Sequence, residues 1–292
     1  MIPRNKALLF AILSTCFSSI AVIYHAIAAK EIPIFQAIAV SNTSGGLILL
    51  SFLLLRREKI DWKTLLNHKF DFFMVMMCRF IVGTIILWKA MSLTLGIKAM
   101  FFSKVEPYFI LLWQWILDGV TIPLGHFYLL LVHFLGAVIL SGGDFSELGP
   151  TQIGDLLLLV AMSIYALSYR FASRLTTGAS PLSLAMLTQL TSGLLFFPLA
   201  LMYQPLMTWQ FEGPGWFALF MTVILWNLLG FPFWFIALKG LPGWLVSALR
   251  ALGPVVAAPI AIIFFGQHLS TWQWAGAAIV ISTSFLLARE RR

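Results

Sequence analysis

Two opposite charges and a proline stand close together in an otherwise apolar stretch, "MFFSKVEPYFILLW" (residues 100–113). The charges are Lys104 and Glu106, and the proline is Pro107. A charge at the centre of a membrane helix costs at least about 2.5 kcal/mol on insertion scales, so it normally faces protein or water. Lys104 and Glu106, two residues apart, point to nearly opposite sides of a helix. A helix over this stretch must therefore have protein or a wet cavity on two sides.

Two more basic residues, Arg79 and Arg250, also fall inside apolar runs. Together with Lys104 they outnumber Glu106, the carboxylate at the same depth, so the local potential is positive. That potential suits the carboxylate of a substrate, and it would suit a phosphate as well. The chemistry that these residues offer is binding of an anion inside a membrane.

The composition requires a membrane environment for most of the chain. Of its 292 residues 60% are hydrophobic and 10% are charged, and the mean hydropathy is +0.94. Runs of about 20 apolar residues, the length that crosses a bilayer, recur throughout. We therefore predict an all-α, polytopic membrane protein with ten transmembrane helices at 6–28, 33–55, 71–91, 95–117, 124–142, 151–172, 180–203, 214–237, 241–265 and 271–288.

The basic residues predict the orientation of these helices. Lys and Arg accumulate in cytoplasmic loops, and most of the nineteen fall in inner segments if the N-terminus is inside. Both termini are then cytoplasmic. The net charge of +8 is explained by this topology, so we expect no nucleic-acid partner. The first apolar run exceeds the usual length of a cleaved signal, so we interpret it as an uncleaved span.

The two halves of the chain repeat one another. At a shift of 148 residues Pro33 matches Pro181 and "TSG" recurs, and at a shift of 147 Gly83 matches Gly230 and Pro107 matches Pro254. We predict two five-helix repeats, 1–148 and 149–292. An odd number of spans inverts the second copy, and inverted repeats are common in transporters that work by alternating access. A duplication kept only for packing is the other interpretation.

The repeat suggests which residues bend or close the pathway. A proline inside a helix removes a hydrogen bond and favours a kink, so we assign Pro107 and Pro254, with Gly83, Gly230 and Glu106, to gating or hinge positions. A proline tolerated in a packed bundle is the alternative. Arg250 aligns with Ser103, which shares a helix face with Glu106, so we expect Arg250 to approach Glu106, with Arg79 as the other candidate partner.

Aromatic and polar side chains in the spans complete a predicted substrate site. Aromatic faces bind apolar groups and can hold an ammonium, and buried amides can hydrogen-bond a substrate, although Ser and Thr often only pack helices. The predicted substrate-binding residues are Arg79, Trp88, Phe101, Lys104, Tyr108, Tyr165, Tyr169, Gln189, Trp226, Asn227, Trp244, Ser247 and Arg250.

The chain lacks the motifs of several other functions. It has no nucleotide-binding loop, no nucleophile elbow and no metal-binding histidine pair, and its two cysteines lie in apolar runs. We therefore expect no catalytic residue, no metal and no cofactor. Glu106 is the carboxylate available for proton coupling, and an arginine partner would keep it ionised, so we expect facilitated movement down a gradient.

The sequence resembles the drug/metabolite transporter superfamily, and within it the EamA-type ten-helix transporters. The segments that carry the resemblance are "GDLLLLVAMSIYALSYRFASRL" (154–175) and "ALKGLPGWLVSALRALGPVVAAPIAIIFFGQHLS" (237–270), with a weaker copy at 89–119. The chain has Val120 and Gln267 where the family often has Glu. In its many Trp and Phe residues and its few acidic residues within the spans, the chain is most similar to the bacterial aromatic amino acid exporters.

This resemblance implies a multi-pass protein of the bacterial cytoplasmic (inner) membrane that exports aromatic and other neutral amino acids and related amphiphiles. We expect a monomer whose partners are the lipid bilayer and the small-molecule substrate. A phosphorylated-sugar or nucleotide-sugar exchanger of the same superfamily is the first alternative. A membrane scaffold would not need charges at membrane depth, and a membrane enzyme would need more than one carboxylate there.

Overall fold

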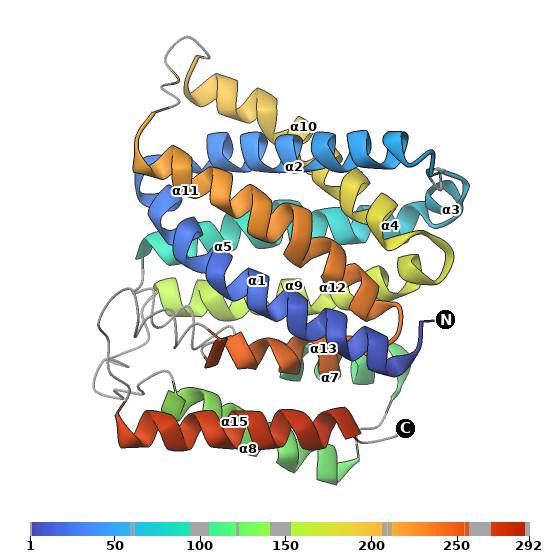
Figure 1. The fold of residues 1–292 in the computed structure, drawn as a ribbon, viewed down its shortest axis with the longest axis vertical. Coiled ribbons are helices and arrows are strands. Elements are labelled where there is room, and N and C mark those ends of the chain that lie inside the picture. Colours follow the sequence, from blue (N-terminus) through green and yellow to red (C-terminus); the bar gives the residue numbers. More distant parts are fainter. Residues whose placement is uncertain are drawn as a thin grey trace. The chain divides into compact units, whose positions relative to one another are not determined.

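The computed structural model describes residues 2–58, 60, 62–93, 105–120, 123–140, 153–205, 209, 212–253, 255–256 and 270–289. Every regular element among these residues is a helix (Figure 1). Those used below are α1 (Arg4–Glu31), α2 (Ile34–Leu55), α3 (Trp62–Asn67), α4 (Lys69–Val75), η1 (Met76–Ile81), α5 (Val82–Leu93), α7 (Glu106–Asp118), α8 (Leu124–Leu140), α9 (Ile153–Gly178), α10 (Pro181–Tyr203), α11 (Pro214–Thr222), η5 (Val223–Gly230), α12 (Phe231–Leu238), α13 (Gly243–Leu249), η6 (Arg250–Leu252) and α15 (Thr271–Arg289).

Each predicted span overlaps helical residues. Six continuous helical segments are long and apolar enough to cross a membrane, and α8 and α13–η6 are shorter apolar helices within the described part of the chain. Large apolar side chains remain exposed along the helices, among them Leu54 (62%), Phe217 (58%) and Phe285 (60%). Such a surface needs a lipid environment. The chain is thus a multi-pass membrane protein, whereas ten crossings and cytoplasmic termini stay predictions.

The described helices form two compact units. Unit 1 comprises Met1–Met76 and Ala172–Gly240, and unit 2 comprises Met77–Phe171 and Leu241–Arg292. Each unit therefore combines helices from both halves of the sequence. The predicted boundary between residues 148 and 149 divides the chain by sequence similarity, whereas the two units are defined by contacts. The boundary between the repeats therefore stays a prediction.

In unit 1, α2 packs along α10 (Figure 1). Gly45 and Gly193 allow the close approach. The place of a Cβ on Gly45 is taken by Oε1 of Gln189, and that of a Cβ on Gly193 by Oγ1 of Thr43. Both oxygens are buried without a conventional hydrogen bond among the described residues. Each oxygen therefore occupies the space that a side chain would take on a glycine of the other helix, so the two helices need glycine at both positions.

The other packing layer of unit 1 joins α1 to the segment α11–η5–α12. The hydroxyl of Ser14 donates to the carbonyl of Gly230 at 2.7 Å. On α12, the rings of Phe231 and Trp234 stack with their centroids 5.5 Å apart, and Phe235 meets Trp234 edge-on at 4.8 Å. These three side chains are at most 2% exposed and form an aromatic core.

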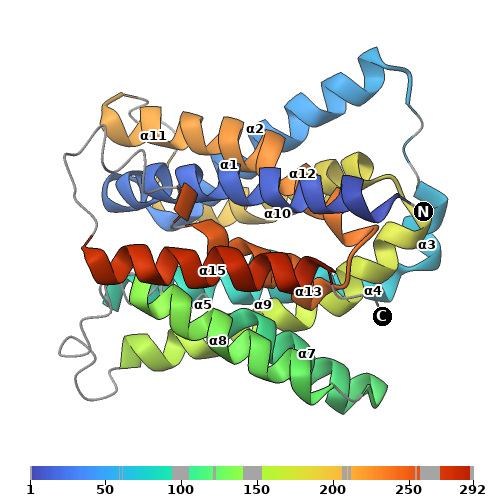
Figure 2. The same ribbon diagram turned by 60° about the horizontal axis from the view of Figure 1, so that its bottom comes forward.

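In unit 2, α8 packs along α15 (Figure 2). Gly136 and Gly276 face each other at this crossing. A Cβ on Gly136 would lie 3.3 Å from the carbonyl oxygen of Gly276, and a Cβ on Gly276 would lie 2.8 Å from that of Gly136. Each glycine thus lies against the backbone of the other helix, and a side chain at either position would push the two helices apart.

Two predicted spans contain a π-helical turn that the sequence did not indicate. The segment 71–91 is built from α4, η1 and α5, and the segment 214–237 from α11, η5 and α12. A π-turn adds one residue to a helical turn and is frequent at functional sites. The first of them contains Arg79 and the second contains Asn227.

Candidate functional site: a buried carboxylate between two arginines

Glu106 is a buried carboxylate at the first residue of α7. It is 3% exposed, and its Oε2 accepts hydrogen bonds from the hydroxyls of Ser247 at 2.6 Å and Tyr169 at 3.2 Å. No hydrogen bond reaches Oε1 from the described residues. Burying an ionised carboxylate is costly unless cations lie nearby.

Two guanidinium groups flank Glu106 inside unit 2. Nη1 of Arg79 lies 3.9 Å from Oε1, and Nη1 of Arg250 lies 3.7 Å from Oε2. The approach of Arg250 and Arg79 to Glu106 that the sequence suggested is therefore confirmed. With Glu106 ionised the three groups carry one net positive charge. The side chain of Arg79 is 7% exposed and that of Arg250 is 31% exposed, so the two cations differ in access.

Arg79 is held from several sides. Its guanidinium carbon lies 5.2 Å from the ring centroids of both Tyr165 and Tyr169. Nη1 also donates to the hydroxyl of Ser168 at 3.4 Å. Cation–π contacts and a hydrogen bond from α9 thus fix this side chain beside Glu106. The geometry makes Arg79 a buried counter-ion.

The π-turn η1 and its flanking residues hold the backbone of Arg79 in place. The hydroxyl of Thr84 donates to the carbonyl of Arg79 at 2.7 Å, and it lies 3.1 Å from the hydroxyl of Tyr165. A Cβ on Gly83 would collide with the carbonyl of Cys78 and with the Tyr165 ring. Glycine is therefore required here so that α9 can approach closely enough for its tyrosines to reach Arg79.

A second polar cluster lies in unit 1, between α2, α10 and η5. The amide of Asn227 donates to the carbonyl of Ser41 at 3.3 Å and to Oδ1 of Asn42 at 2.9 Å. Asn42 in turn donates to Ser192 at 3.0 Å, and Gln189 donates to the carbonyl of Asn227 at 2.9 Å. Gln189 and Asn227 are at most 2% exposed. These amides tie three helical segments together, and contact with a substrate stays a prediction for them.

Two other predicted aromatic residues of unit 2 contact residues of α8. The ring of Tyr108 meets Phe127 and Phe134 edge-on, with centroids 6.3 and 5.9 Å apart. Trp244 meets His126 edge-on at 5.6 Å. These contacts are ordinary interhelical packing, and a substrate role for Tyr108 and Trp244 stays a prediction.

The remaining described aromatics of the predicted site are partly buried. Trp226 lies in η5, where its ring is 5.6 Å from that of Phe231. A Cβ on Gly230 would lie 2.9 Å from the Trp226 ring and 3.1 Å from the carbonyl of Leu225. Trp88 lies on α5. Gly230 is thus needed for close packing in unit 1, as Gly83 is in unit 2.

Three predicted site residues, Phe101, Lys104 and Pro254, lie outside the described residues. Pro107 is described, and it occupies the first turn of α7. The first helical N–H groups have no intrahelical acceptor, so a proline there costs no hydrogen bond of α7. A kink at Pro107 would involve residues before 105 and stays a prediction.

Several residues of these clusters were missed by sequence reasoning. Asn42, Thr84 and Ser168 each lie inside a predicted apolar span. An amide at mid-span is as costly to bury as Asn227, so Asn42 could have been found by that criterion. The hydroxyls of Thr84 and Ser168 could not, because Ser and Thr are common in membrane helices without any such role.

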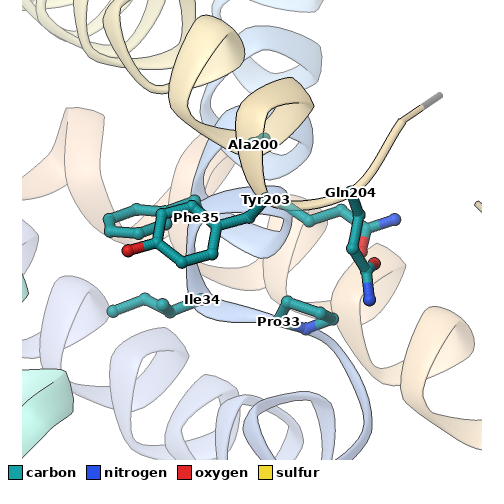
Figure 3. Close-up of a pocket in the computed structure, with 7 residues that line it drawn as sticks. Pro33, Ile34, Phe35, Ala200, Tyr203 and Gln204 are labelled. Carbon is teal, nitrogen blue, oxygen red and sulfur yellow. The ribbon is translucent and has the colours of Figure 1, made fainter.

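A cavity of about 270 Å³ opens in unit 1, away from the predicted site residues. It is lined by Pro33, Ile34, Phe35, Gln36, Ala200, Tyr203 and Gln204 (Figure 3). The rings of Phe35 and Tyr203 lie 5.0 Å apart. The lining is mainly apolar and contains no charged side chain, so it cannot supply the charge-based recognition available at Glu106.

Comparison with known proteins identifies part of the chain. Residues 152–289 match the sequence profile of the EamA-like transporter family. A solved crystal structure superposes with a TM-score of 0.79 at 18% sequence identity, covering 98% of this chain and 99% of its own. That likeness shows a shared fold. No curated protein matches the chain.

Proposed function

We propose that this chain exports amino acids across a bacterial cytoplasmic membrane by alternating access. The match of residues 152–289 to the EamA-like transporter family supports a transport function. The substrates are aromatic and other neutral amino acids and related small amphiphiles. The inverted repeat supplies two equivalent conformations, one open to each side.

The observation that carries the proposal is the unequal exposure of the two arginines beside Glu106. Arg79 is buried against two tyrosine rings and serves as the counter-ion of the carboxylate. Arg250 has the same carboxylate at 3.7 Å, but 31% of its side chain is exposed. The net positive charge of the group is therefore presented by Arg250, which pairs with the carboxylate of an amino acid.

The phosphate alternative is less well supported by the same geometry. A sugar phosphate carries up to two negative charges and is usually bound by more than one cation. Of the two arginines at Glu106, Arg250 is the more exposed one. Within the described part of the chain, this one partly exposed guanidinium matches one carboxylate better than a phosphate dianion. With two guanidinium groups within 4 Å of its oxygens, Glu106 is assigned to the ion cluster rather than to proton transfer, and the proposed movement is facilitated diffusion without proton coupling.

A flux panel in proteoliposomes tests the proposal. Labelled phenylalanine, leucine, their amides, glucose 6-phosphate and a nucleotide sugar are offered to the purified protein at imposed pH gradients. We expect flux of the amino acids, little flux of the amides that lack the carboxylate, and no dependence on the pH gradient. Preferred flux of the phosphates would favour the exchanger alternative, and no flux at all would favour a scaffold.

A matched pair of variants assigns the flux to this group. Arg250→Gln should abolish the preference for the amino acid over its amide. Arg170→Gln removes another arginine of unit 2, one that pairs with Asp118 through two nitrogens, and should leave that preference intact. An unchanged preference in Arg250→Gln would contradict the assigned role.

A further inference from the structure

His133 is a buried histidine of α8 that the site described above does not use. It is 3% exposed, although a histidine on a membrane helix carries a large cost unless both ring nitrogens have partners. Nδ1 lies 2.7 Å from the hydroxyl of Thr283 on α15, and Nε2 lies 3.0 Å from the carbonyl oxygen of Ala248 on α13. One imidazole thus joins three helices of unit 2.

The partner of Nε2 fixes the direction of that hydrogen bond. A carbonyl oxygen only accepts, so Nε2 carries a proton and donates to Ala248. The partner of Nδ1 does not fix a direction in this way, because the hydroxyl of Thr283 has one proton and lies 2.7 Å from the carbonyl oxygen of Ile279 as well as from Nδ1. The bond from Nε2 to Ala248 is the one that reaches the helix of the candidate site.

The carbonyl of Ala248 lies where the helix changes its geometry. The α-helix α13 ends at Leu249, and the short 3-10 helix η6 begins at Arg250. Carbonyls at such a junction leave the regular α-helical pattern, and the backbone N–H of Arg250 turns to the carbonyls of Ala248 and Ser247. His133 adds a donor to Ala248 from a separate helix, and it thereby constrains the backbone at this junction.

The residues on either side of Ala248 are those that reach Glu106. Ser247, directly before it, donates to Oε2 of Glu106 at 2.6 Å. Arg250, two residues after it, lies 3.7 Å from the same oxygen. A shift of this backbone by a fraction of an ångström would change both contacts, because each is made by a side chain of the same turn.

We infer that His133 is a positioning residue for the anion site: its Nε2–H holds the α13–η6 junction so that Ser247 and Arg250 keep their places at Glu106. This inference rests on the proposed function for its transport readout. It assigns to α8 a part in substrate selectivity.

Two substitutions separate the two bonds of the ring. His133→Gln keeps an amide donor at the position of Nε2 and loses the group at Nδ1. His133→Asn keeps a polar group near Nδ1 and is too short to reach Ala248. We expect His133→Asn to raise the KM for phenylalanine about tenfold and to weaken the preference over phenylalaninamide, with maximal flux within about threefold of wild type. His133→Gln should stay within about threefold of wild type in all three quantities.

Equal effects of the two variants, or a wild-type KM in His133→Asn, would overturn the inference. A residue needed only for packing would lower the thermal stability of both variants and leave the amino-acid preference unchanged. Should His133→Asn fail to fold, the double variant His133→Gln with Thr283→Val decides. It keeps only the bond to Ala248, so a wild-type KM is expected and a raised KM refutes the proposal.

A measurement without substrate separates this inference from the proposed function. Phenylglyoxal labels exposed arginines, and mass spectrometry of the purified protein follows its rate at Arg250. We expect the labelling rate of Arg250 to differ by about threefold or more between His133→Asn and His133→Gln. The reason is that the exposure of an arginine sets its reactivity, and the α13–η6 junction sets the exposure of Arg250. If wild type moves no amino acid while this difference is found, the transport proposal fails and the positioning role stands. An equal rate removes the positioning role.

Discussion

The two arginines at Glu106 should respond differently to substitution. Arg79→Gln should destabilise the protein strongly, and Arg250→Gln should leave most of the stability but remove recognition of the substrate carboxylate. The difference follows from the exposure of the two side chains, 7% for Arg79 and 31% for Arg250. It separates a counter-ion that maintains the structure from a cation that binds substrate.

The contacts of Arg79 set the size of the effect. An ion pair at 3.9 Å corresponds to about 4 kcal/mol of Coulomb energy at an effective dielectric constant of about 20. The two tyrosine rings at 5.2 Å add about 1 kcal/mol each. Part of this sum is offset, because the substitution also ends the cost of burying the guanidinium. Breaking a buried pair from one side costs about 3–5 kcal/mol, and we expect about 3 kcal/mol because Arg250 stays beside Glu106.

For Arg250→Gln the expected loss is about 1 kcal/mol, since water screens its partly exposed side chain. Unfolding free energies measured in mixed lipid and detergent micelles provide the comparison, with Arg170→Gln as the control. Adding Glu106→Gln to Arg79→Gln should restore part of the loss, because the uncompensated carboxylate is then gone. Equal losses for Arg79→Gln and Arg250→Gln, or no rescue by Glu106→Gln, would refute the division of roles.

Three further predictions use the same unfolding assay. Asn227→Leu should lower the free energy of unfolding by about 1–2 kcal/mol, because two interhelical hydrogen bonds of about 0.6 kcal/mol each are lost and their partners stay buried. The control is Ser51→Ala, at an exposed hydroxyl, and an equal loss in that variant would contradict the reasoning. Gly276→Val should lower the free energy of unfolding by about 1–3 kcal/mol, because the new side chain overpacks against the facing backbone. Ala278→Val, on the exposed side of α15, should not lower it. A tolerated valine at position 276 would argue against the close crossing. Asp118→Asn should change stability by less than about 1 kcal/mol, and the change should shrink as salt is added; a large, salt-independent loss would show that its partly exposed ion pair is stronger than its exposure implies.

Hydrophobic length is a local signal, so the sequence was sufficient to locate several of the helices. The predicted spans 33–55 and 271–288 agree with α2 and α15 to within one residue at each end. The approach of Arg250 to Glu106 could also be predicted, since a buried charge requires an opposite charge and few were available at membrane depth. The cost of an unpaired ion thus restricts the possible contacts strongly enough to identify a pair 144 positions apart in the chain.

The roles of uncharged polar residues could not be predicted in the same way. Gln189 and Asn227 were assigned to the substrate because buried amides are costly, but that cost is met equally well by a neighbouring helix. Which of the two happens depends on the packing of α2 against α10 and η5, and no local pattern contains it. The same holds for His133, whose partners on α13 and α15 are far away in the sequence.

The two π-turns connect the sequence repeat with the geometry of the candidate site. Val223, the first residue of η5, follows Met76, the first residue of η1, by 147 residues, which is the shift that aligns Gly230 with Gly83. At both glycines the place of a Cβ lies close to the carbonyl five residues earlier, that of Cys78 in one case and that of Leu225 in the other. The local sequences of η1 and η5 differ, so what they share is their position in the repeat. If the π-turn serves the function of the unit, a duplicated unit would retain it at equivalent positions. In the first copy this turn contains Arg79, the counter-ion of Glu106.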